Sequence, residues 1–127
     1  MKLTRRDILD GMKEWIRDKM PSVKLPDGNV AKRAVVNIAG RDILVKSTFL
    51  NETYANNKDY VSTDKLDLTL RLAREFQDWL PTAKWTMSEM GKHNKGWYDV
   101  YETIYKGEKI RALVKSETGV LYTMRLN

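Results

Sequence analysis

The stretch WYDVYETIYKGEKIRALVKSETGVLYTMRL, residues 97–126, decides the fold, because two short polar turns divide it into three segments of alternating polarity. The turns are the tripeptide 106–108 and the segment 116–119, and each contains a glycine. Short glycine-containing turns are typical of antiparallel neighbours in a sheet. We therefore expect a three-stranded meander with strands at residues 97–105, 109–115 and 120–126.

Alternation along each expected strand divides its side chains between two faces of the sheet. One face is expected to be buried and apolar. Its members are Val100, Ile104, Ile110, Ala112, Val114, Val120, Tyr122, Met124 and Leu126. The other face is expected to be open, with Tyr101, Tyr105, Arg111, Lys115, Thr123 and Arg125. Aromatic rings can stack on bases, and Arg and Lys can hold phosphate oxygens, so this face is a candidate surface for RNA.

The residues before the meander predict helices and a hairpin. Thr4 resembles a helix cap, and apolar residues at helical spacing continue to Met20, before Pro21. Residues 21–29 are expected to be a loop, residues 33–49 a hairpin that turns at Gly40-Arg41, and residues 50–60 a short helix or a loop. A second long helix should begin near residues 62–64 and end at Pro81, followed by a connection over residues 82–96.

This order predicts one α+β domain over residues 1–127, with helices packed on one face of the antiparallel sheet. Residues 1–32 would form an N-terminal helix and loop, and residues 33–127 the core of the domain. At 127 residues and 42% hydrophobic composition, the chain is large enough to bury a core.

The charge favours a polyanionic partner, most simply nucleic acid. Residues 47–83 hold four Lys or Arg and six Asp or Glu, a net −2, so with a total of +6 the rest of the chain carries +8. The chain has no cysteine, one histidine and no acidic cluster at ligand spacing, so we expect no metal site and no cofactor. The lack of cysteine fits a cytoplasmic protein, and we expect neither a membrane span nor a signal peptide.

The single histidine, His93, lies in the segment MGKHNKG, residues 90–96, just before the first strand of the meander. Gly91 and Gly96 would let the backbone approach a substrate, and Lys92 and Lys95 would favour the neutral imidazole by repulsion. A neutral imidazole beside a cationic sheet face is suited to proton transfer.

The order of elements, with NIAGRDILVKST at residues 37–48 and the meander at 97–126, resembles the barnase/EndoU/colicin/RelE-like nuclease fold. In particular, it resembles versions carried as domains of phage and mobile-element polyproteins and toxins, and the resemblance covers residues 33–127. It implies a metal-independent ribonuclease, a hydrolase whose catalytic groups lie on the sheet face. The matching positions here are Lys46, His93, Arg111 and Thr123, and this chain has no second histidine.

The predicted function is therefore RNA cleavage at the basic and aromatic sheet face, with His93 as the proton-transfer group. The residues expected to bind RNA are Lys92, Lys95, Tyr101, Lys115 and Arg125. Tyr98, Tyr101 and Glu102 stay open as the second acid or base. Two alternatives stay open as well: a non-catalytic nucleic-acid-binding module, and a phage or mobile-element accessory protein that binds another protein as an inhibitor.

Overall fold

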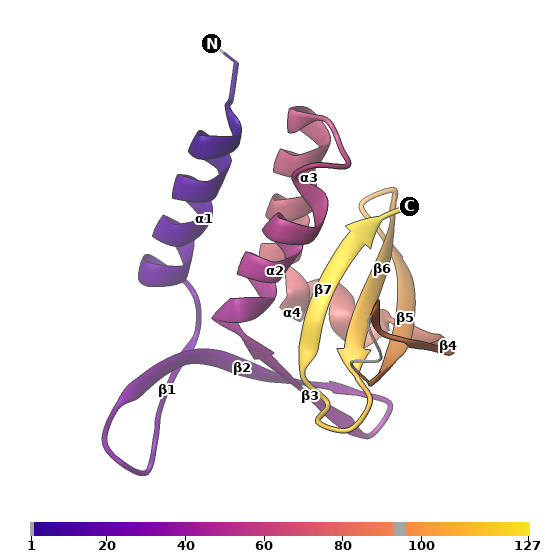
Figure 1. Ribbon diagram of the computed structural model, residues 1–127. Coiled ribbons are helices and arrows are strands. Elements are labelled where there is room, and N and C mark those ends of the chain that lie inside the picture. The colour runs from indigo at the N-terminus through magenta and orange to yellow at the C-terminus, as the bar shows by residue number, and fades with distance from the viewer. Residues whose placement is uncertain (1, 93–95) are drawn as a thin grey trace.

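The computed structural model describes residues 2–92 and 96–127. Within these residues the protein is α+β, as predicted, with helices, a short 3₁₀ helix and two antiparallel sheets (Figure 1). The helices are α1 (Arg5–Asp18), α2 (Ser47–Asn57), α3 (Thr63–Arg74), α4 (Phe76–Trp79) and the 3₁₀ helix η1 (Leu80–Thr82). The strands are β1 (Ser22–Lys24), β2 (Val30–Ile38), β3 (Arg41–Lys46), β4 (Lys84–Met90), β5 (Trp97–Tyr105), β6 (Glu108–Lys115) and β7 (Leu121–Leu126).

The predicted meander is confirmed: β5, β6 and β7 are antiparallel neighbours in that order. At the β5–β6 turn Lys106 has φ 51° and Gly107 has φ 77°. Positive φ at both central residues is the mark of a type I′ turn, whose twist matches that of the strands it joins. The capping box between Thr4 and Asp7 likewise starts α1 where the sequence predicted it.

Other elements differ from the prediction. The expected loop over residues 21–29 contains β1, and the expected connection over residues 82–96 contains β4, which extends the meander to four strands in the order β4-β5-β6-β7. The hairpin of β2 and β3 does not join this sheet but forms a separate one with β1. The predicted single sheet is therefore wrong. Residues 50–57, part of the segment left open between a helix and a loop, are helical, and this helix begins at Ser47, inside the predicted hairpin.

The predicted long helix is interrupted at Glu75, between α3 and α4. The Glu75 carboxylate accepts hydrogen bonds from Lys106 Nζ at 2.6 Å and from Tyr105 Oη at 3.0 Å. These contacts hold the break against the β5–β6 turn. A pattern of apolar spacing could not reveal it, because residues on both sides of the break are buried.

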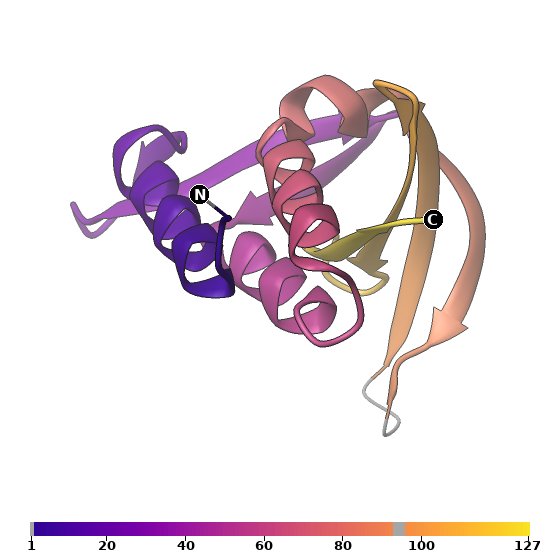
Figure 2. The ribbon, with the colours of Figure 1, turned by 90° about the horizontal axis from the view of Figure 1, so that it is seen from above.

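One apolar core joins the helices, the β2–β3 hairpin and the inner face of the β4–β7 sheet (Figures 1 and 2). Trp79 is fully buried and donates its Nε1 hydrogen to Leu72 O at 2.7 Å, and Phe49 meets Phe76 edge-on at 6.4 Å between ring centroids. The predicted burial of Ile110, Ala112 and Val114 is confirmed.

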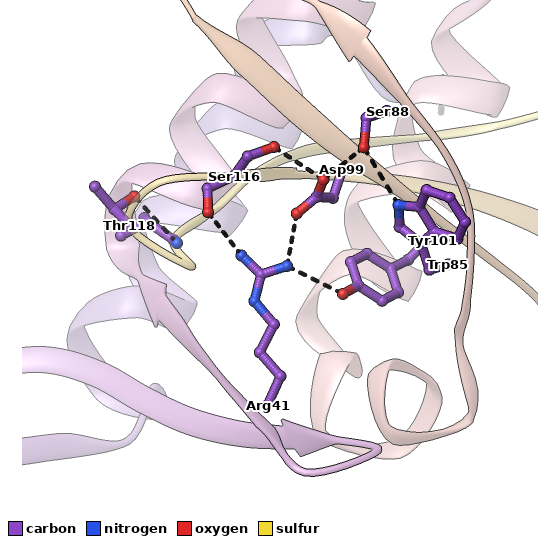
Figure 3. Close-up of polar contacts among 8 residues, drawn as sticks. Arg41, Trp85, Ser88, Asp99, Tyr101, Ser116 and Thr118 are labelled. Atoms are coloured by element: carbon purple, nitrogen blue, oxygen red, sulfur yellow. Dashed lines mark hydrogen bonds and ion pairs between the residues drawn. The ribbon is translucent and has the colours of Figure 1, made fainter.

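A polar cluster ties the two sheets together (Figure 3). Arg41 at the start of β3 donates from Nη1 to Asp99 Oδ2 at 2.6 Å and to Tyr101 Oη at 3.1 Å, and from Nη2 to Ser116 O at 3.1 Å. Asp99 Oδ1 accepts from the hydroxyls of Ser88 and Ser116 at 2.8 and 2.9 Å. Both oxygens of this carboxylate are therefore used at the junction of the sheets.

Val100 of β5 is buried as predicted, but Tyr101, Ile104 and Tyr105 of this strand differ from the predicted faces. Tyr101 was expected on the open face, but its ring is 7% exposed in the core and its hydroxyl accepts from Arg41. Tyr105 lies on the same inner side, whereas Ile104, expected to be buried, is 74% exposed. Both alternating sets of β5 contain large apolar groups, so polarity alone could not identify the inner one.

A β-bulge in β7 moves Tyr122 away from its predicted buried position. Leu113 pairs with Thr123, but Val114 pairs with Leu121, so Tyr122 is an extra residue in the ladder. An extra residue shifts the alternation by one position. Leu121 is thus buried together with Met124, and Tyr122 and Thr123 both lie on the open side of the sheet.

Candidate functional site

A groove of about 580 Å³ lies over the open face of the β4–β7 sheet. Its floor is formed by β6 and β7, one wall by the end of α2 and the following loop, and the other wall by the ends of β4 and β5. Figures 1 and 2 show these elements around the sheet, with the helical core on the opposite face. The volume is within the range of small-molecule and nucleotide sites.

Two arginines face each other in the floor of the groove. Arg111 on β6 and Arg125 on β7 are register partners, and cross-strand partners share one face of a sheet. Lys92 also lines the groove, and Glu89 is the one carboxylate among the described lining residues. These four charged groups give the described lining a net charge of +2, which favours anions.

A buried hydroxyl lies beside the arginines. Thr123 is 8% exposed and lines the groove, and its Oγ1 has no hydrogen-bond partner among the described residues. A buried hydroxyl that makes no hydrogen bond costs about 1–3 kcal/mol. A polar ligand group at this point of the floor would recover that cost.

Two tyrosines form one end of the groove. The rings of Tyr98 and Tyr122 lie 5.3 Å apart between centroids at 37°, and Lys115 Nζ lies 5.5 Å from the centroid of Tyr122. Burial raises the pKa of the Tyr122 hydroxyl, so this group stays protonated near neutral pH. The end of the groove is therefore aromatic and cationic, a combination that suits bases and phosphates.

The end of α2 holds the strand that carries this floor. Asn57 Nδ2 donates to Met124 O at 3.0 Å, and Met124 N donates to Thr53 Oγ1 at 3.4 Å. Met124 lies between Thr123 and Arg125, so these bonds fix the β7 backbone at the two groove residues. They also cover the outer edge of β7, which the four-stranded sheet leaves unpaired.

Gly91 is needed for the position of Tyr98. A Cβ atom at Gly91 would collide with Tyr98 Cε2 and lie 3.1 Å from Gly96 O. We predict that Gly91→Ala displaces the Tyr98 ring and lowers the free energy of unfolding by about 1–3 kcal/mol, the usual cost of overpacking. Chemical denaturation and the near-ultraviolet signal of the tyrosines measure both effects.

Gly11→Ala is the matched control, because a Cβ there would meet only Arg74 Nη2, at 3.8 Å, within α1. Alanine in a helix interior is favoured over glycine by roughly 1 kcal/mol, so this variant should be as stable as the wild type or more stable. An equal loss of stability in both variants would contradict the role given to Gly91.

The structure brings together some of the predicted site residues and separates others. Arg111, Thr123, Arg125 and Lys92 line the groove, and Lys115 lies beside it over Tyr122. Lys46 does not line it: this residue ends β3 and precedes α2. Tyr101 lies on the opposite, buried face. His93 and Lys95 lie outside the described residues.

Among the three open candidates for the second acid or base, Tyr98 alone lines the groove. Glu102 shares the open face but pairs with Lys109 at 3.5 Å outside the groove lining. Glu89 was not predicted as a site residue, because residues 82–96 were expected to be a connection. The residues of β4 are almost all exposed, and the alternation of polar and apolar residues from Lys84 to Ser88 is short and ends before Glu89. The Trp85-Thr86-Met87 run, which is compatible with a strand, was the available signal.

Comparison of the chain with protein-family models, curated proteins and solved structures found no match. Among the described helices, none combines the length and apolarity that crossing a lipid bilayer requires. Residues 2–92 and 96–127 contain no group of three or more His, Asp or Glu side chains that could hold a metal ion.

Proposed function

We propose that the groove binds single-stranded RNA and that the protein cleaves it without a metal ion, with His93 as a proton-transfer group. The observation that carries the proposal is the register pairing of Arg111 with Arg125, next to the Thr123 hydroxyl, which has no hydrogen-bond partner in the described part of the chain. Two cations and a hydroxyl on one floor suit a phosphodiester, and tyrosines at the end of the groove suit bases.

Metal-free cleavage of RNA joins the 2′-oxygen to phosphorus and releases the 5′-oxygen, which leaves a 2′,3′-cyclic phosphate. One group removes the 2′-hydroxyl proton, another gives a proton to the 5′-oxygen, and cations stabilise the charge that develops on the phosphorane. His93 follows Lys92, a residue of the groove lining, and is proposed for one proton transfer. Tyr98 and Glu89 are the candidates in the groove for the other.

Binding without cleavage is the alternative at the same site. It needs the cations and aromatic rings of the groove, but neither proton transfer. The resemblance to nuclease domains of phage, mobile elements and toxins favours cleavage, and it stays a prediction, as does a cytoplasmic location.

A protein partner is the second candidate function, and a separate surface supports it. Trp85, Met87 and Trp97 are 46–57% exposed at the β4 edge of the sheet, and they are not part of the groove lining. Exposed aromatic and Met side chains are typical anchors of protein interfaces. This surface would account for an accessory or inhibitory role if the groove binds no RNA.

Arg125→Ala tests the binding proposal. Its affinity for a short single-stranded RNA with methylated 2′-hydroxyls, which cannot be cleaved, should fall about 3- to 10-fold at low salt. The slope of log affinity against log salt should decrease by about 0.7, the value for one lost phosphate contact on a single strand. Fluorescence anisotropy from about 50 to about 200 mM salt measures both quantities.

Arg6→Ala is the matched control, since Arg6 lies on α1, exposed and paired with Asp10. Both variants lose one positive charge, so a nonspecific attraction would weaken equally in both. Binding by the wild type that does not depend on salt would argue against the groove and for the protein partner.

A further inference from the structure

We propose that Glu89 acts as a selectivity gate of the groove, by which we mean that its carboxylate forms an ion pair with the Arg111 guanidinium and that a ligand phosphate must displace it in order to bind Arg111. The inference rests on the proposed function, because it concerns how the same groove chooses its ligand. It assigns Glu89 a positioning role in binding, which is separate from any proton transfer.

The geometry places the gate across the floor. Glu89 lies on β4 and Arg111 on β6, so their ion pair spans β5, with Oε2 and Nη2 2.9 Å apart. The register partners of Glu89 and Arg111 on β5 are Tyr98 and Glu102, and Val100 lies between them. Val100 is on the open face, like its own register partner Leu113, yet it is fully buried. The side chains of Glu89 and Arg111 are 36% and 20% exposed, so solvent screens the pair only in part.

In the groove, Arg111 is thus neutralised by Glu89. Arg125 and Lys92 are exposed and form no ion pair among the described residues. A small single anion meets the Glu89 carboxylate at Arg111 and gains little by displacing it. A chain of phosphates also gains contacts with Arg125 and Lys92, which offset the cost of opening the pair.

Glu89→Gln is the direct test. Glutamine keeps the size of the side chain and an oxygen that can accept from Arg111, so the fold should be retained. Affinity for the 2′-O-methylated RNA should rise about 5- to 10-fold, the effect of removing one partly screened internal anion. The salt dependence should become steeper by about 0.7, because there is then no displaced Glu89 carboxylate to take up a cation and offset the one that the RNA phosphate releases at Arg111.

Two further variants separate the gate from a general change in charge. Glu102→Gln removes a carboxylate from the same sheet face, outside the groove lining, and should leave affinity and salt dependence close to the wild type. In an Arg111→Gln background, Glu89→Gln should not raise the affinity for RNA, because the cation that Glu89 pairs with is already absent. Circular dichroism checks that each variant is folded.

Inorganic polyphosphate is the second probe, and it distinguishes failure of the gate from failure of the proposed function. One outcome is that Glu89→Gln binds polyphosphate more tightly than the wild type does, that this increase depends on Arg111, and that no variant binds RNA. This outcome would support the gate and overturn RNA as the ligand. RNA binding that is weakened by Arg125→Ala but unchanged by Glu89→Gln would overturn the gate alone. An equal gain in Glu89→Gln and Glu102→Gln would overturn it too, and absence of binding by every variant to both probes would overturn both proposals.

Discussion

Replacing His93 by alanine is expected to lower RNA cleavage by about 100- to 10,000-fold, the usual contribution of one general acid or base. It is the only histidine of the chain, and no cysteine is present, so no other side chain has an unperturbed pKa near neutrality. Binding of the 2′-O-methylated RNA should change little, because proton transfer stabilises the transition state and not the bound ground state.

Gel-based cleavage assays on labelled RNA, in the presence of EDTA, measure this effect. Added imidazole should restore part of the activity of His93→Ala, since free imidazole can transfer the missing proton. Lys95→Ala is the matched control from the same segment: it should weaken binding and its salt dependence, but it should leave the cleavage rate at saturating RNA within a few-fold of the wild type.

Two outcomes would contradict the enzyme proposal. Wild-type protein that binds RNA without cleaving it between about pH 5 and pH 9, a range around the ordinary histidine pKa of ~6.5, would leave a binding module. Equal cleavage by the wild type and His93→Ala would give the proton transfer to another group, such as Glu89 or Tyr98, or to a contaminating nuclease. A Glu89→Gln, Tyr98→Phe protein purified in parallel separates these two explanations.

Local patterns predicted the meander and four residues of the groove lining, Lys92, Arg111, Thr123 and Arg125. The alternation around Ile110 and Val114 identified the inner face of β6, and therefore placed Arg111 on the open face, where it lies. Arg125 and Thr123 were assigned correctly for a related reason: they follow the bulge, where the ladder is regular up to Leu126.

The errors arose where distant contacts decide the structure. Tyr101 faces the core because Arg41, 60 residues earlier in the chain, supplies a donor for its hydroxyl. Tyr122 faces the groove because of a bulge, which local polarity does not encode. Glu89 lies on an exposed edge strand, beyond the short alternation of Lys84 to Ser88, and its backbone is held extended by pairing with β5. Sequence periodicity detects burial, so it missed features set by polar contacts between segments.

The polar junction of the two sheets supports the other prediction with a large effect: Asp99→Asn should lower the free energy of unfolding at neutral pH by about 2–3 kcal/mol. The substitution removes the carboxylate that accepts from Arg41, Ser88 and Ser116. Breaking a fully buried ion pair costs ~3–5 kcal/mol, and the value here is smaller because the Arg41 side chain is 33% exposed. Urea denaturation measures the difference.

The pH dependence of this difference has a defined sign. Burial by itself raises the pKa of Asp99, but the hydrogen bonds from Arg41, Ser88 and Ser116 outweigh it, so the pKa of the folded state is lowered. A carboxyl with a lowered pKa stabilises the fold above its unfolded pKa of ~3.9 and loses this contribution as the pH falls through its folded pKa. The difference in the free energy of unfolding between the wild type and Asp99→Asn should therefore be constant above about pH 5 and become smaller below about pH 4.

Asp18→Asn is the control for this pH dependence, because the pKa of Asp18 is also lowered, by a hydrogen bond from Arg17, but the pair is exposed on the surface of α1. Its stability should stay close to that of the wild type at neutral pH. If the difference in the free energy of unfolding between the wild type and Asp99→Asn does not become smaller at acid pH, the substitution acts through altered packing and not through the lost charge. Equal losses in the two variants would show that Asp99 does not tie the β2–β3 hairpin to the four-stranded sheet.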